Sequence, residues 1–337
     1  MSSSGTLIIA EAGVNHNGSV PMARELVDAA ASAGADAVKF QTFMTDSLVL
    51  EEAEKAPYQR RVDNTGENQH EMLRKLELDR SGHLELIDCC SEREIEFLSS
   101  AFDEESLKLL NELGITRFKI PSGELTNVPY LRLVSSFGKS IILSSGMATL
   151  AEVEKTLKIL ETGGTPRQQI TVLHCNTAYP TPMEHVNLRA MLTVRDELGV
   201  EVGYSDHTLG CEIAVAAVAM GATVIEKHFT LDKRLPGPDH RASLEVRDFK
   251  KLVRAIRNVE AAFGDAIKQP SPSESENIVA ARKSIVARTV IKQGEQFSRE
   301  NLTVKRPGTG VSPMEWDQLV GQIATRSYKV NEQIESS

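Results

Sequence analysis

The sequence is poor in cysteine and in aromatic residues, and it contains no long apolar run. Its 337 residues include four cysteines and one tryptophan, and 5% are aromatic. The cysteines show neither a CxxC pair nor zinc-finger spacing, so we expect reduced thiols. No run approaches the roughly 18 apolar residues that span a bilayer. The N-terminal MSSSGTLIIAEAG also lacks the basic and apolar regions of a secretion signal, which predicts a cytoplasmic protein.

Positive charge is in short supply as well. Lysine and arginine number 38 against 47 acidic residues, and the net charge is −9. This balance argues against general binding to nucleic acid or to a membrane surface. A small anionic substrate is still compatible with it, because a few clustered lysines can override the mean field locally. Its content of hydrophobic residues, 41%, is ordinary for a globular protein. Its length allows one large domain or two ordinary ones.

Short apolar runs recur along the first two thirds of the chain and predict buried strands. They cover residues 7–13, 37–43, 96–102, 117–123, 140–146, 171–176, 200–206 and 223–229. Helical patterns lie between and after them, at 19–35, 104–114, 149–164, 211–222 and 246–264. Eight alternating strand and helix units predict an α/β fold of the TIM (β/α)8 barrel type. An open doubly wound sheet is the alternative, but it favours a Gly-rich first turn, and no GxGxxG is present.

Composition divides the chain into three parts. We expect a catalytic barrel at 1–264, a Pro/Ser/Glu-rich linker at 265–282 and a small, mostly β module at 283–337. A module of about 55 residues is marginal alone, so it should lean on its own barrel or on a neighbour's. The long connection 44–95, which includes KAPYQRR (55–61), is either a surface loop or, as we expect, a lid over the substrate.

Polar residues gather where the expected strands end, which in a TIM barrel is the mouth of the active site. They include Glu11, Lys39, Gln41, Ser100, Lys119, Ser122, Glu124, Ser144, Ser205, Asp206, His207, Glu226 and His228. Taken singly, such residues usually cap helices or face solvent. Together, two lysines and several hydroxyls suit a substrate that carries phosphate and carboxylate groups.

Two histidines end consecutive strands, so barrel geometry makes His207 and His228 neighbours. Neutral imidazoles with open coordination positions suit Mn²⁺, Fe²⁺, Co²⁺ or Zn²⁺. A metal-free alternative uses Lys119 as a Schiff-base lysine, with the nearby Lys39 lowering its pKa. The residues alone leave both alternatives open.

Several motifs, in order and spacing, resemble the sialic acid synthases. They include IIAEAGVNHNG (8–18), VKFQTF (38–43), FKIPSGE (118–124), ILSSGMAT (142–149), LHCNTAYPTP (173–182), YSDHTLG (204–210), IEKHFTLD (225–232) and GPDHRASLE (237–245). ARKSIVA (281–287) and KRPGTGVSPMEWDQLVG (305–321) are similar to that family's antifreeze-like (SAF) domain. The resemblance covers essentially the whole chain. One departure is SSAF (99–102), where many members read STPF; the hydroxyl of Ser100 remains, but Ala101 replaces a rigid proline.

The resemblance implies an enzyme that condenses phosphoenolpyruvate with an N-acetylated amino sugar and releases phosphate. We expect N-acetylmannosamine as the sugar and N-acetylneuraminate (sialic acid) as the product. The alternative is a legionaminate or pseudaminate synthase that uses a 2,4-diacetamido-6-deoxy hexose with the same chemistry. A catalytically silent sugar-binding protein is the third hypothesis, and the intact lysines and histidines argue against it.

The resemblance also implies roles for individual residues. A divalent metal, expected to be Mn²⁺ with Mg²⁺ or Co²⁺ as alternatives, would bind His207 and His228 and polarise the aldehyde. Residues matching the phosphoenolpyruvate site are Lys39, Ser100, Lys119, Ser122 and Ser144, and Ser205 is also expected to bind substrate. Glu124 matches an acid/base candidate, while Glu11, Gln41, Tyr179 and Asp239 match positions around the sugar and metal. Arg306 matches an arginine that reaches the partner's active site in a domain-swapped homodimer.

Overall fold

The computed structural model of the protein describes residues 5–55, 60 and 66–335. Most of the KAPYQRR segment lies outside the described residues. The chain divides into two compact units, one ending at Phe263 and the other beginning at Gly264. The segment expected as a linker belongs to the second unit and contains a short helix, α12 (Ser275–Ala281).

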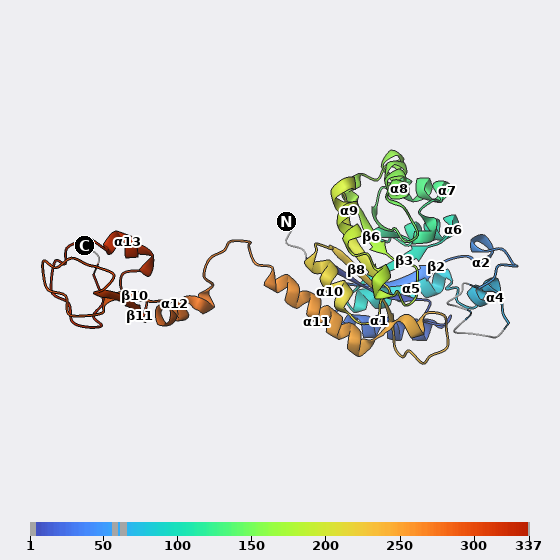
Figure 1. Cartoon of the computed structure of the whole chain (residues 1–337). Helices are drawn as coiled ribbons and strands as arrows, with labels where there is room; N and C mark the ends of the chain where they lie inside the picture. Colours follow the sequence, from blue (N-terminus) through green and yellow to red (C-terminus); the bar gives the residue numbers. More distant parts are fainter. Residues whose placement is uncertain (1–4, 56–59, 61–65, 336–337) are drawn as a thin grey trace. The chain divides into compact units, whose positions relative to one another are not determined.

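The first unit is a closed parallel barrel (Figure 1). Its strands are β1 (Leu7–Gly13), β2 (Ala37–Thr42), β3 (Glu96–Ala101), β4 (Arg117–Ile120), β5 (Ser140–Ser144), β6 (Ile170–Cys175), β7 (Glu201–Asp206) and β8 (Val224–Thr230). Each strand pairs with the next, and β1 pairs in parallel with both β2 and β8. The predicted TIM barrel is therefore confirmed, and closure of the sheet rules out the open doubly wound alternative.

One principal helix follows each strand of the barrel. These helices are α1 (Val20–Ala33), α5 (Arg80–Glu92), α6 (Glu104–Glu112), α7 (Val128–Ser136), α8 (Leu150–Gly163), α9 (Arg189–Leu198), α10 (Glu212–Ala219) and α11 (Val246–Ala262). Local sequence fixes their ends: Thr149 and Glu152 form a capping box on α8, and Gly34 ends α1 in the left-handed region at φ 84°. Within the described part of the chain, no helix combines the length and apolar character that crossing a bilayer requires.

The two faces of each strand have different neighbours, because side chains alternate along a strand. Outward residues such as Ile8 and Phe40 are buried against the helices. Inward residues in the lower barrel form a small apolar cluster of Ile9, Ala37, Leu98, Ile142, Leu173 and Val224. Two residues further along the same faces stand polar side chains, among them Glu11, Lys39 and Ser100. The apolar layer thus lies beneath the polar residues, which form the floor of the site.

The connection between β2 and β3 is only partly an insertion. Its last helix, α5, is the ordinary barrel helix of this unit, with Leu86, Cys89 and Cys90 buried. The added part contains α2 (Thr45–Leu48) and α4 (Gln69–Arg74). Only the segment before α5 can therefore belong to the lid predicted over 44–95, because α5 packs on the barrel wall beside α1.

The second unit has a small core of its own. Strands β10 (Ser284–Ala287) and β11 (Leu302–Lys305) pair antiparallel, and short bridges join further segments. Ile285, Phe297 and Tyr328 are among its buried residues. A short helix, α13 (Trp316–Leu319), carries the single tryptophan of the chain. The predicted small β module is confirmed as an element of the fold.

Candidate active site

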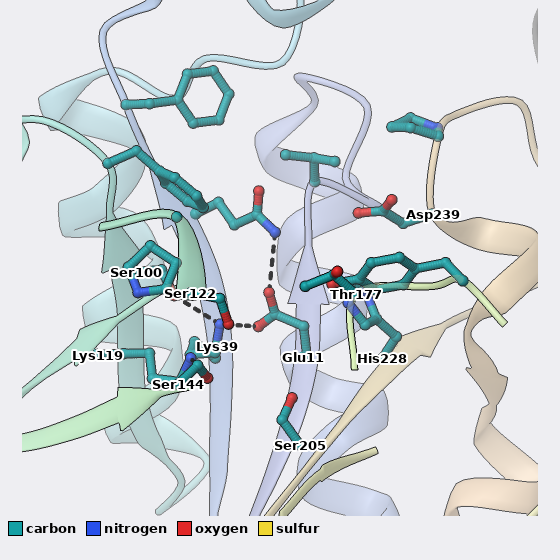
Figure 2. A pocket seen from close by; sticks show the side chains of 18 of the residues that line it. Glu11, Lys39, Ser100, Lys119, Ser122, Ser144, Thr177, Ser205, His228 and Asp239 are labelled. Carbon is teal, nitrogen blue, oxygen red and sulfur yellow. Dashed lines mark hydrogen bonds and ion pairs between the residues drawn. The ribbon is translucent and has the colours of Figure 1, made fainter. Parts of the chain in front are cut away.

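A cavity of about 330 Å³ opens at the carboxyl ends of the barrel strands. Twelve of the residues predicted to bind substrate or metal line it: Glu11, Lys39, Gln41, Ser100, Lys119, Ser122, Ser144, Tyr179, Ser205, His207, His228 and Asp239. In the view of Figure 2, the lysines and Ser100 lie on one side of Glu11, and His228 and Asp239 lie on the other. A cavity of this size suits small-molecule substrates.

Lys39 lies at the centre of the polar floor. Its Nζ lies 2.6 Å from Glu11 Oε2 and 3.7 Å from Glu226 Oε2, and it donates to Ser100 Oγ at 2.8 Å (Figure 2). Burial by itself lowers the pKa of Lys39, but Glu11 and Glu226 outweigh it and raise that pKa above its ordinary value. Lys39 therefore stays protonated although it is only 2% exposed.

Lys119 supplies the second buried cation. Its Nζ donates to Ser144 Oγ at 2.8 Å and lies 3.5 Å from Glu226 Oε1. Burial lowers the pKa of Lys119, and the attraction of Glu226 does not fully offset this. Burial would raise the pKa of Glu226, yet Lys119 and Lys39 hold it at about 2. Glu226 is thus a fixed anion between two lysines.

Glu226 was recognised at a strand end but was not assigned to the site from the sequence. Ser205 donates to its Oε1 at 2.9 Å, so strand β7 also holds this carboxylate in place. A usable signal existed, because Glu226 follows the inward-facing Val224 by two residues and precedes His228 by two. Cys175 is a second lining residue that the sequence analysis did not assign; its Sγ lies 3.4 Å from Ser122 Oγ.

The two histidines are neighbours in the lining of the cavity, with ring centroids 5.5 Å apart. His207 Nδ1 donates to the carbonyl of Asn176, which leaves Nε2 as the lone-pair nitrogen. The buried Nδ1 of His228 has no hydrogen-bond partner among the described residues. Burial lowers the pKa of both imidazoles and favours their neutral, ligand-competent form.

These observations fit a divalent transition metal held by His207 and His228. No group of three or more His, Cys, Asp or Glu side chains with metal-binding geometry occurs within the described ranges, so protein ligands alone would leave coordination positions open. Open positions are typical of catalytic sites rather than structural ones. The ring of Tyr179 contacts both imidazoles: it is tilted by 37° to His207 with centroids 4.2 Å apart, and it meets His228 edge to face at 5.6 Å.

Asp239 lines the cavity from the loop after β8. Burial, followed by the charge of Glu11, raises the pKa of its carboxyl group to about 7. Its main-chain carbonyl accepts a hydrogen bond from Ser243 Oγ at 2.7 Å, and that hydroxyl also accepts from Asn15 Nδ2 at 2.9 Å. The loop is therefore tied to the segment that follows β1, and Asp239 lines the same cavity as the two histidines and Glu11.

Two of the predicted site residues are not among those that line this cavity. Glu124 is absent from the cavity lining, and its Oε2 accepts a hydrogen bond from Asn127 Nδ2 at 2.7 Å at the start of α7. Arg306 belongs to the second unit, where its Nε donates to the carbonyl of Ala281 at 3.0 Å. Their catalytic and substrate-binding roles remain predictions.

The insertion contributes directly to the cavity. Leu48 at the end of α2, Met72 on α4 and Leu76 beyond it all line its upper part. The insertion therefore lines the cavity, while its role as a lid over the substrate stays a prediction; residues 56–59 and 61–65 lie outside the described ranges.

Comparison with known proteins identifies the family. Residues 26–268 match the NeuB family, and residues 282–334 match the SAF domain. The chain belongs to the NeuB family. It is therefore an enzyme of the sugar-acid synthase type, as the motifs predicted, and the third hypothesis of a silent sugar-binding protein loses its support.

Individual relatives refine this assignment. N,N'-diacetyllegionaminic acid synthase of Campylobacter jejuni is 53% identical over 329 residues, covering 98% of each chain. The enzyme of the same name from Legionella pneumophila is 48% identical over 316 residues, covering 93% of this chain and 89% of the other. A crystal structure of N-acetylneuraminic acid synthetase from Leptospira borgpetersenii is 32% identical with a TM-score of 0.70, covering 82% of this chain and 90% of that one. The similarity favours the legionaminate alternative over the expected sialic acid.

Proposed function

We propose that this NeuB-family enzyme condenses phosphoenolpyruvate with a 2,4-diacetamido-2,4,6-trideoxy hexose to give N,N'-diacetyllegionaminate and inorganic phosphate. The observation that carries this proposal is one cavity with two buried lysines and four serines beside two neutral histidines. The 53% identity to a protein named for this product supports the choice of sugar. N-acetylmannosamine becomes the second candidate.

The reaction forms two bonds and breaks one, and the proton that the attacking water loses balances the one that the former aldehyde oxygen gains. Carbon 3 of phosphoenolpyruvate attacks the sugar aldehyde, water adds to carbon 2, and the bond from carbon 2 to the phosphate oxygen breaks. Lys39, Lys119 and the hydroxyls of Ser100 and Ser144 would hold the phosphate and carboxylate groups of phosphoenolpyruvate. Their burial excludes bulk water, which strengthens each of these contacts.

The charge balance of the floor supports a metal requirement. Lys39 and Lys119 are already paired with Glu11 and Glu226, which offset much of their positive charge. An anionic substrate entering this cavity would introduce uncompensated negative charge at low dielectric. A divalent ion on His207 and His228 would compensate that charge and supply Lewis-acid polarisation of the aldehyde. Mn²⁺ is our first choice, because imidazole and oxygen donors suit it.

The homodimer remains part of the proposal. The match of residues 282–334 to the SAF domain supports a role for Arg306 across a subunit boundary. Truncation after residue 264 should then remove an arginine from the partner's site. Mixing this truncated chain with a full-length His207→Ala chain should restore activity if the second unit acts on its partner.

The test is phosphate release from phosphoenolpyruvate with each candidate sugar, first with Mn²⁺ and then with excess chelator. We expect turnover with the diacetamido trideoxy sugar that stops on chelation and returns with Mn²⁺. Turnover with N-acetylmannosamine alone would move the assignment to sialic acid, and a preference for the stereoisomeric pseudaminate precursor would move it to that product. Turnover that survives thorough chelation would overturn the metal site and favour Lys119 as a Schiff-base lysine.

A further inference from the structure

The upper part of the cavity is apolar, in contrast to its charged floor. Six side chains form what we call the apolar wall: Val14, Phe43, Leu48, Met72, Leu76 and Phe102. They come from three strand ends and from the insertion between β2 and β3. The charged floor and the wall therefore give one cavity two chemically different halves.

Strand periodicity places the wall above the floor. Phe43 follows Gln41 by two residues, and Phe102 follows Ser100 by two, so each pair lies on the same inward face. A two-residue step along a strand is roughly 7 Å. The wall is thus one side-chain layer further from the barrel floor than the residues expected to bind phosphoenolpyruvate.

The wall is a packed surface and not a loose loop. Val14, Phe43, Met72 and Leu76 belong to one buried cluster, and Phe102 packs against it. The rings of Phe43 and Phe102 meet edge to face at 6.3 Å. Its shape therefore exists before substrate binds.

Polar contacts at both ends of the insertion hold the wall in place. Asn68 and Glu71 form a capping box that fixes the start of α4. The Thr45 amide donates to Glu77 Oε1 at 2.7 Å, which ties the start of α2 to the segment after α4. Leu48 and Met72 are carried on these two anchored helices.

The chemistry of the substrate follows from this placement, and the inference rests on the proposed function. The aldehyde carbon must reach the floor to meet phosphoenolpyruvate, so the distal carbons of the sugar extend towards the wall. Hydroxyl groups there would lose water and gain no partner from these six side chains. Methyl groups would instead pack against them.

One polar side chain stands at the same rim. Gln69, the first residue of α4, lines the cavity, and its side-chain amide has no hydrogen-bond partner within the described part of the chain. An amide can both donate to and accept from an acetamido group. We propose that the apolar wall and Gln69 select a sugar whose distal carbons carry a methyl group and a second acetamido group, and that the wall rejects a terminal hydroxyl.

The experiment uses four sugars that differ at two positions: hydroxyl or acetamido at carbon 4, and hydrogen or hydroxyl at carbon 6. For the full-length enzyme with Mn²⁺ we expect kcat/KM to favour the 6-deoxy sugars by about 10–100-fold. Met72→Gln and Leu48→Asn keep side-chain size and add polar atoms, so they should reduce this ratio to within a few-fold. Gln69→Leu should reduce the preference for acetamido at carbon 4 and leave the carbon 6 preference unchanged.

Controls separate selection from folding. Leu50 lies in the same insertion but is 83% exposed and does not line the cavity, so Leu50→Asn should leave both ratios unchanged. Met72→Leu should keep the wild-type ratio. If Met72→Gln fails to fold, the half-buried Leu48→Asn decides the question on its own.

The outcomes distinguish this inference from the proposed function. A wild-type enzyme that prefers 6-hydroxylated sugars, or ratios unchanged in every folded wall variant, would overturn the wall as the selective element while leaving the condensation reaction intact. Absence of phosphate release with all four sugars would instead overturn the proposed function, and the inference with it.

Discussion

A buried ion pair beside the histidines gives the sharpest stability prediction. Lys227 Nζ lies 2.6 Å from Asp206 Oδ2, and the two side chains are 2% and 0% exposed. Lys227 also donates to the carbonyl of Thr208 at 2.8 Å, while Asp206 Oδ1 accepts from the amide and hydroxyl of Thr208. The pair therefore joins β7, β8 and the loop that carries His207.

Asp206→Asn keeps the size of the side chain but removes the charge and turns an NH₂ group towards the buried ammonium. Stranding one partner of a buried pair costs about 3–5 kcal/mol. At about 2–4 °C per kcal/mol for a unit of this size, the melting temperature of the barrel should fall by roughly 6–20 °C. Adding Lys227→Met should recover much of this loss, because it removes the uncompensated charge.

The assay must report on the barrel alone. The single tryptophan, Trp316, lies in the second unit, so far-UV circular dichroism should follow the barrel while tryptophan fluorescence serves as an internal reference. Excess chelator in all samples removes any contribution from metal binding. The control is Asp248→Asn at an exposed pair with Lys251, where a loss below about 1 kcal/mol is expected. A loss below about 1 kcal/mol for Asp206→Asn as well would refute the reasoning.

Three further predictions concern the buried lysine, the metal site and the packing of strand β7. Lys119→Met should lower kcat/KM for phosphoenolpyruvate by at least about 10–100-fold, because it removes a charged donor to substrate and leaves Glu226 with one cation fewer. Steady-state kinetics at saturating sugar measure this, and an unchanged value would exclude Lys119 from the binding site. His207→Ala should abolish both turnover and retention of Mn²⁺ after gel filtration, whereas retained metal would show that other residues bind it. Gly203→Ala should lower the free energy of unfolding of the barrel, measured in urea, by about 1–3 kcal/mol. The added Cβ would lie 2.6 Å from Leu173 Cδ2 and closer still to the Val224 carbonyl oxygen. Wild-type stability would contradict this prediction and would mean that β7 shifts to make room.

The barrel was predictable because its strands are buried on both faces. Runs such as LIIAEAG and TVIEKHF have no solvent-exposed face, and each was located to within a residue or two of β1 and β8. The eight-unit alternation then favoured a closed sheet over an open one. Local patterns could not show where the insertion ends, because α5 and α4 are both amphipathic and differ only in what they pack against.

The apolar wall was beyond sequence reasoning for a physical reason. Met72 and Leu76 have the spacing of any buried helical face, and nothing local distinguishes packing against a core from lining a cavity. The same limit applies to Glu124. Its motif matches an acid/base position, yet in the structure the carboxylate is held by Asn127, a contact that depends on how the turn before α7 is formed.

The position of Glu226 follows from the barrel assignment and from electrostatics. Once residues 223–229 are taken as a barrel strand, the apolar Val224 and the metal candidate His228 must share one face, and every second residue between them must face inward as well. Position 226 is the only such residue, and it is a carboxylate beside two inward lysines from other strands. A buried carboxyl group stays ionised only when cations pair with it, and here two buried lysines need an anion as well. Strand periodicity and electrostatics together therefore require Glu226 to lie against Lys39 and Lys119, which is the arrangement observed.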